Sequence, residues 1–101
     1  MKLLMIVVDD SKKEELEVFL NRSGVQGYTE VSHAAGMGST EPRLGSSAFP
    51  RTSAVVFTVI SDKALARLNA AVDEFCSTCG SELQMIALDV EVLRGFAEPA
   101  A

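Results

Sequence analysis

The sequence predicts an α+β domain of the ferredoxin-like kind, a four-stranded antiparallel sheet with two helices on one face. Its 101 residues, 48% of them hydrophobic and 23% charged, suit one globular domain. Apolar periodicity gives the element order β-α-β-β-α-β, which is two split βαβ units. We therefore treat residues 1–101 as a single domain, with a long loop segment over 36–53 and a short tail over 95–101.

The first strand and helix are predicted at 3–8 and from about 11 to 22. Residues 3–8 form a continuous apolar run, which is typical of a strand buried on both faces. Ser11 and Glu14 have the spacing of a capping box, with Ser11 at the N-cap. Gly24 follows the helix as a natural C′ residue.

The second and third strands flank the long loop. Residues 27–35 contain several polar side chains, and this polarity predicts an edge or solvent-facing strand. Residues 53–60 are rich in β-branched side chains and mainly apolar on both faces, which is the clearest strand pattern in the chain.

The second helix and the last strand complete the predicted fold. Ser61 begins a helix that should run to about residue 79, and apolar side chains recur along it at helical spacing. These side chains are Leu65, Leu68, Val72 and Phe75. Gly80 ends the helix, and residues 83–93 alternate as a strand should.

The strands at 3–8 and 53–60 are apolar on both faces, but two helices can cover only one face of the sheet. Val55, Phe57 and Val59, or their opposite-face neighbours, would then lie in water as a large apolar patch. A face of several hundred Å² represents on the order of 10 kcal/mol of transfer free energy. We therefore expect a homo-oligomer.

The polar stretch 36–51 contains three of the seven glycines and two of the three prolines. Neither a helix nor a strand runs easily through such a segment, and connections of about 16 residues in small domains tend to be functional or disordered. Arg43 and Arg51 can bind an anion, and Leu44 and Phe49 are bulky apolar anchors for a partner. We expect a partner-binding loop that a ligand orders.

Cys76 and Cys79 have the C-x-x-C spacing of zinc and redox sites, and His33 is the only histidine available to complete a metal site. Both cysteines flank the apolar stripe of the predicted helix, so buried free thiols are the alternative. Asp9 and Asp10 could bind a cation or act as an acid and base, although Asp10 is better explained as a helix cap. No nucleophile accompanies His33, and we predict no catalytic residue.

Charge and hydropathy exclude several classes of function. The net charge of −5 and the pI near 4.7 argue against nucleic acid as a partner. No apolar run approaches the roughly 20 residues of a membrane span. The apolar run at 3–8 is too short for a secretion signal and is followed by two aspartates rather than a cleavage site. We expect a cytoplasmic protein.

The chain resembles the PII signalling proteins and the smaller PII-like relatives of the nitrogen regulatory proteins. The order of elements carries this resemblance, together with four short motifs. The motifs are Gly27-Tyr28-Thr29, Gly36-Met37-Gly38, Pro42-Arg43-Leu44-Gly45 and Phe49-Pro50. The resemblance implies a non-enzymatic regulator, a homotrimer whose sheets pack around a central axis, and a T-loop over 36–53 that contacts a protein target, soluble or membrane-associated.

The same resemblance implies a small-ligand site in the clefts between subunits. The residues that would form it here are Gly36, Met37, Gly38, Arg43, Gly80 and Arg94. Relatives that bind adenine nucleotides carry a Gly-Asp-Gly-Lys turn before the last strand. Residues 79–84 of this chain lack that lysine and add Glu82, which would repel a phosphate. The cofactor therefore stays open.

Two other classes of protein share this topology. A CutA-like trimeric metal-binding or stress protein is the main alternative, with Cys76, Cys79 and His33 as ligands. A dimeric ferredoxin-like barrel enzyme, with His33 as its base, is a weaker one. It needs a pocket between sheet and helices, which the apolar stripe of the second helix would fill.

Overall fold

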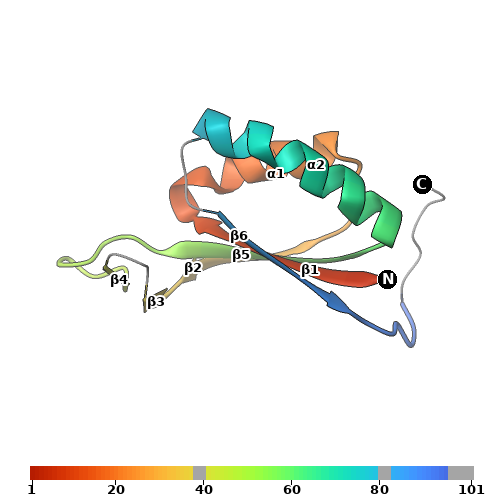
Figure 1. The fold of residues 1–101 in the computed structure, drawn as a ribbon. Helices are drawn as coiled ribbons and strands as arrows, with labels where there is room; N and C mark the ends of the chain where they lie inside the picture. Colours follow the sequence, from red (N-terminus) through yellow and green to blue (C-terminus); the bar gives the residue numbers. More distant parts are fainter. Residues whose placement is uncertain (38–40, 80–82, 96–101) are drawn as a thin grey trace.

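Four antiparallel strands form a sheet that two helices cover on one side (Figure 1). A computed structural model describes residues 1–37, 41–79 and 83–95, with side chains in the second helix described as far as Phe75. The strands lie in the order β2-β5-β1-β6. Their bounds are β1 Lys2–Asp9, β2 Thr29–Ala34, β5 Ser53–Ile60 and β6 Leu83–Asp89. This arrangement confirms the predicted ferredoxin-like fold.

The first helix begins differently from the prediction. A 3-10 turn, η1 (Asp10–Lys12), precedes α1 (Lys13–Arg22). Asp9, rather than Ser11, is the N-cap of this turn. The carboxylate of Asp9 accepts hydrogen bonds from the backbone N–H of Ser11, at 2.9 Å, and from its hydroxyl. The capping box was therefore a wrong prediction. An ionised carboxylate is a stronger acceptor than a hydroxyl, and β1 extends far enough to place Asp9 at the cap.

The other helix ends follow the sequence. Gly24, with φ of 85°, ends α1 in a Schellman motif: its N–H donates to Asn21 O at 3.2 Å and the N–H of Val25 donates to Leu20 O at 3.0 Å. The hydroxyl of Ser61 caps α2 (Asp62–Cys79) by accepting from the Ala64 N–H at 3.1 Å. No helix among the described residues is long and apolar enough to span a bilayer.

The core lies between the sheet and the helical layer. Alternate residues of β1 and β5 point toward the helices and are almost fully buried, where Leu16 and Leu20 of α1 and Leu68 of α2 meet them. These strand residues are Leu4, Ile6, Val8, Ala54, Val56 and Ile60.

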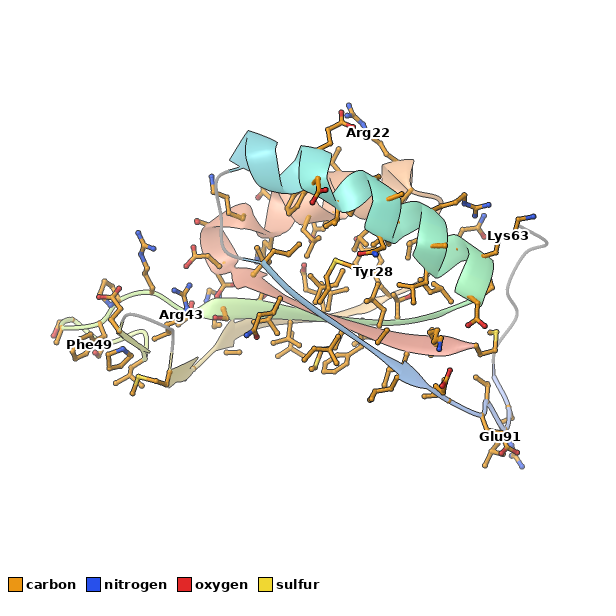
Figure 2. All side chains as sticks on the ribbon, in the orientation of Figure 1. Arg22, Tyr28, Arg43, Phe49, Lys63 and Glu91 are labelled. Carbon is orange, nitrogen blue, oxygen red and sulfur yellow. The ribbon has the colours of Figure 1, made fainter. Side chains whose placement is uncertain are left out.

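The opposite face of the sheet is mainly apolar, and no helix of the described residues covers it (Figure 2). Strand register sets its side chains in rows across the sheet, for example Phe57, Met5 and Ile86. The remaining apolar members of this open face are Leu3, Val7, Val31, Val55, Val59 and Leu88. Ile86 and Leu88 are 44% and 56% exposed, which is high for side chains of this kind.

Both outer strands are shorter than predicted. β6 ends at Asp89 because β1, which pairs with it, begins at Lys2, the residue opposite Asp89. The Val90 N–H still donates to Met1 O at 3.3 Å, and beyond it residues 91–93 are not in a strand. β2 lies at the sheet edge, as its polarity predicted, and has an irregularity between Val31 and Ala34.

The long loop contains strand structure that the sequence did not predict. β3 (Gly36–Met37) pairs with β4 (Pro42–Arg43), Gly36 opposite Arg43. Gly and Pro are tolerated here because two paired residues form a minimal ribbon with no further neighbouring strand among the described residues. The loop extends beyond the end of the main sheet, at the left of Figure 1.

Candidate functional site

Arg43 fastens the long loop to the end of β1. Its Nη2 forms an ion pair with Asp9 Oδ1 and donates to Thr52 O at 3.0 Å, and its Nε donates to Ser53 Oγ at 3.0 Å. The Arg43 and Asp9 side chains are only 18% and 20% exposed. Three protein groups thus bind a guanidinium that was predicted to bind an anion.

Asp10 holds the same junction from the other side. Its N–H donates to Thr52 O at 3.1 Å, and its Oδ2 accepts from the Thr52 hydroxyl and from the His33 N–H at 2.9 Å. Asp10 was predicted to cap the helix, which is wrong because these two donors engage its carboxylate. Asp10 Oδ1 is buried and has no hydrogen-bond partner within the described part of the chain. The two aspartates therefore join β2 and both ends of the loop; we call this junction the loop stem (Asp9, Asp10, Arg43, Thr52, Ser53).

The stem sets the charge state of Asp9. Burial is the largest single influence and raises the pKa of this carboxyl, but the hydrogen bonds from Ser11 and the guanidinium of Arg43 together outweigh it. The pKa of Asp9 therefore lies below its ordinary value, and Asp9 and Arg43 are both charged at neutral pH.

Half of the predicted ligand residues gather at the stem. The β3–β4 ribbon places Gly36 opposite Arg43, with Met37 adjacent and 77% exposed. Arg94 follows β6 at the opposite end of β1 from Asp9, so one chain alone does not bring it to Arg43. Gly38 and Gly80 lie outside the described residues.

Three of the four predicted partner-binding residues lie beyond the stem, and the fourth is Arg43 itself. Leu44 is 53% exposed and Arg51 is exposed, whereas Phe49 is half-buried. The Phe49 N–H donates to Ser46 Oγ at 3.1 Å and the Ser46 N–H donates to Phe49 O at 3.1 Å, which folds the tip into a tight turn. Figure 2 shows Phe49 at the far end of the loop from Arg43.

The predicted metal residues are not brought into a complete site by the described structure. The His33 side chain is 79% exposed, and its Nδ1 lies 3.6 Å from Asp10 Oδ2. Cys76 and Cys79 lie at the end of α2, and their side chains are outside the described structure. Among the described residues no group of three or more His, Cys, Asp and Glu is arranged to hold a metal ion.

A second perturbed carboxyl group lies between β2 and α1. Burial, and then the neighbouring Glu17 carboxyl, raise the pKa of Glu30, while Lys13 opposes them. Glu30 Oε1 is buried without a hydrogen-bond partner in the described part of the chain. Sequence reasoning passed over this residue and over Thr52 and Ser53, because a polar residue in or beside a strand gives no signal of its partners.

The fold matches solved structures of PII-like proteins. A PII-like signalling protein from Thermus thermophilus superposes with a TM-score of 0.71 at 21% identity, covering 93% of this chain and 90% of that one. CPII from Thiomonas intermedia K12, a nitrogen regulatory PII-like protein bound to ADP, AMP and bicarbonate, gives 0.67 at 22% identity, over 88% of this chain and 86% of that one. Its apo form gives 0.62 at 19% identity, over 88% and 89%.

At these identities the structural likeness establishes the fold, and the sequence itself establishes the family. No curated protein matches the sequence significantly. The family model for nitrogen regulatory protein P-II, however, matches residues 1–95, a span that includes the whole sheet, both helices and the long loop. The chain therefore belongs to the nitrogen regulatory protein P-II family.

Proposed function

We propose that this chain is a non-enzymatic, cytoplasmic PII-like signalling protein. It assembles as a homotrimer, binds a small anionic ligand in the clefts between subunits, and contacts a target protein through the loop over 36–53. The observation that carries this proposal is the loop stem, which anchors a projecting loop to the core through the Arg43–Asp9 pair.

The stem supports a signalling role because it gives the loop a fixed base and an exposed tip. Leu44 and Arg51 face solvent beyond the stem, where a target can reach them, and Phe49 supports the tip turn. A ligand that draws Arg43 away from Asp9 would release the base and change the presentation of the tip.

The open face of the sheet supports the trimer. Each strand contributes apolar side chains to it, and Ile86 and Leu88 are about half exposed in the single chain. Burying such a face against other copies is favourable in proportion to the apolar area removed from water.

The ligand is proposed from both the chain and its structural neighbours. The CPII structure contains ADP, AMP and bicarbonate, all of them anions. Gly36, Met37 and Arg43 lie together at the stem, and we propose Gly38, Gly80 and a neighbouring subunit's Arg94 as further members of the site. Without the turn lysine, bicarbonate or another small anion is a stronger candidate than a nucleotide.

Thermal shift measurements with ADP, AMP, bicarbonate and divalent metals test this function. A specific ligand raises the melting temperature by mass action, and Arg43→Ala should remove that shift while Lys63→Ala, an exposed cation on α2, should retain it. The shift rather than the starting melting temperature is compared, because Arg43→Ala also weakens the stem. A response to metals alone would favour the CutA-like alternative, and no response to any anion would contradict the proposal.

A further inference from the structure

The outer surface of the helical layer carries a groove of about 650 Å³ between α1 and α2. The stacked rings of Phe19 and Phe75 lie against it, with centroids 5.2 Å apart and an interplanar angle of 27°. Its lining residues lie in α1, at Ser23 and in α2, and none belongs to a strand or to the loop stem, so the groove is separate from both the open face and the stem.

On the α1 side, an acid, an apolar residue and a base line the groove in that order. They are Glu15, Val18 and Arg22, spaced by three and four residues, so they share one face of the helix. Val18 is 52% exposed, and Figure 2 shows Arg22 pointing away from the sheet. Glu15 also contacts Lys12 at 3.7 Å, an exposed pair that holds it only weakly.

On the α2 side, the groove is lined in the reverse order by Arg67, Ala71 and Glu74. The two helices run antiparallel, and Phe19 meets Phe75. Arg22 therefore lies toward the Arg67 end of the groove, and Glu15 lies toward the Glu74 end. One end of the groove is basic, the other acidic, and the middle is apolar.

We propose that the occupant of this groove is α1 from a second copy of the chain, related by a two-fold axis through Val18. Such an axis places the basic end of one copy on the acidic end of the other. Arg22 of each copy then meets Glu15 of its mate, and the two Val18 side chains pack together over the phenylalanine rings. Because the rotation exchanges the basic and the acidic end, opposite charges face each other at both ends and the surface is complementary to itself.

The charge pattern favours a second copy over a small ligand. Two acids and two bases surround the groove, so a ligand with one charge would meet repulsion as well as attraction, whereas an inverted copy satisfies both ends. The apolar centre is small, with Val18 as its exposed large side chain, so the contact should be weak, concentration-dependent and sensitive to salt. This contact forms independently of the open face, and it adds to any assembly that the open face makes.

Sedimentation velocity over a roughly hundredfold range of concentration tests the proposal, because mass action drives a weak contact. The wild-type protein should at least double in mass as concentration rises, from three to six or more chains of 10.8 kDa if the sheet-face trimer forms, because each trimer then carries three grooves. Val18→Glu should abolish the doubling. Ala70→Glu, which adds the same charge at an exposed α2 position outside the groove, should leave it intact.

Charge reversal separates this geometry from a general apolar contact. Glu15→Arg and Arg22→Glu should each suppress the doubling, and the double variant should partly restore it because the Glu–Arg pairs re-form with inverted polarity. A mass that stays constant with concentration would overturn the proposal. So would a double variant whose mass depends on concentration no more than that of either single variant. In a Phe57→Asp background, where the open face cannot assemble, the doubling should run from one chain to two, which separates this contact from the trimer.

Discussion

At the scale of single residues, the Asp9–Arg43 pair determines how firmly the loop is attached. Asp9→Asn keeps the shape of the side chain and an acceptor for Ser11 but removes the charge that Arg43 faces. We expect a loss of about 1 to 3 kcal/mol in the free energy of unfolding, the range for hydrogen bonds to charged groups. Urea unfolding measures it, with the exposed Asp73→Asn as the control.

The same variant gives a pH signature. The pKa of Asp9 is lower in the folded chain, so its contribution is present above the ordinary carboxyl range and is lost as pH falls through the folded value. The difference in the free energy of unfolding between the wild type and Asp9→Asn should therefore become smaller below about pH 4. If this difference in the free energy of unfolding is equal at pH 7 and at low pH, the charge of Asp9 does not contribute to stability.

For Glu30 we predict the opposite dependence of stability on pH. Its pKa is raised in the folded chain, so its favourable contribution exists at low pH and is lost as pH rises through the raised value. Glu30→Gln should therefore increase stability at neutral pH, because it removes a charge that burial and Glu17 disfavour. Chemical denaturation at pH 7 and near pH 4 tests this; Glu41→Gln, exposed in the loop and outside any helix, should change neither value.

At the scale of elements, the loop is held at its base and exposed at its tip. Trypsin should cleave the native protein after the exposed Arg51 before it cleaves after Arg43, which lies in β4 and is 18% exposed. Asp9→Asn should accelerate cleavage after Arg43 and leave the Arg51 rate nearly unchanged. Mass spectrometry of early digests identifies the sites, and first cleavage after Arg43 in the wild type would contradict the described stem.

The sequence predicted elements well where a single helix or strand carries the signal. Ser61 and Gly24 mark helix ends through local hydrogen bonds, and the polarity of residues 29–34 marked an edge strand. The sequence did not indicate which face of the strand at 53–60 packs against the helices, because both faces are mainly apolar. The structure puts Thr58 inside, where its hydroxyl donates to Gly27 O at 2.6 Å.

The features that the sequence did not predict depend on contacts between residues far apart in the chain. Arg43 was singled out from the sequence, but its partner Asp9 lies 34 residues away and was considered only as a cation ligand or an acid/base group. The ribbon between β3 and β4 was missed for a related reason. Two-residue strands carry no periodicity, and only the pairing itself reveals them.

At the scale of the whole molecule, the open face predicts which substitutions disperse the assembly. Phe57→Asp lies on that face, so it should yield a folded monomer of 10.8 kDa by light scattering. Val56→Asp, its neighbour, points into the core at 0% exposure and should unfold the chain, because it buries an unpaired charge. A folded Phe57→Asp trimer would remove the case for assembly through the sheet.

The ribbon between Gly36 and Arg43 also bears on how such a protein can diversify. The turn at Gly45 has a φ of 69°, and a Cβ there would lie 3.0 Å from Thr52 Cγ2, so this position favours glycine. The hydrogen bonds of the stem, however, do not involve residues 44–50. Lengthening a closed loop adds only about 0.6 kcal/mol per doubling. The residues between Gly45 and Pro50 can therefore be exchanged, by evolution or by grafting, while the stem and the sheet keep their structure.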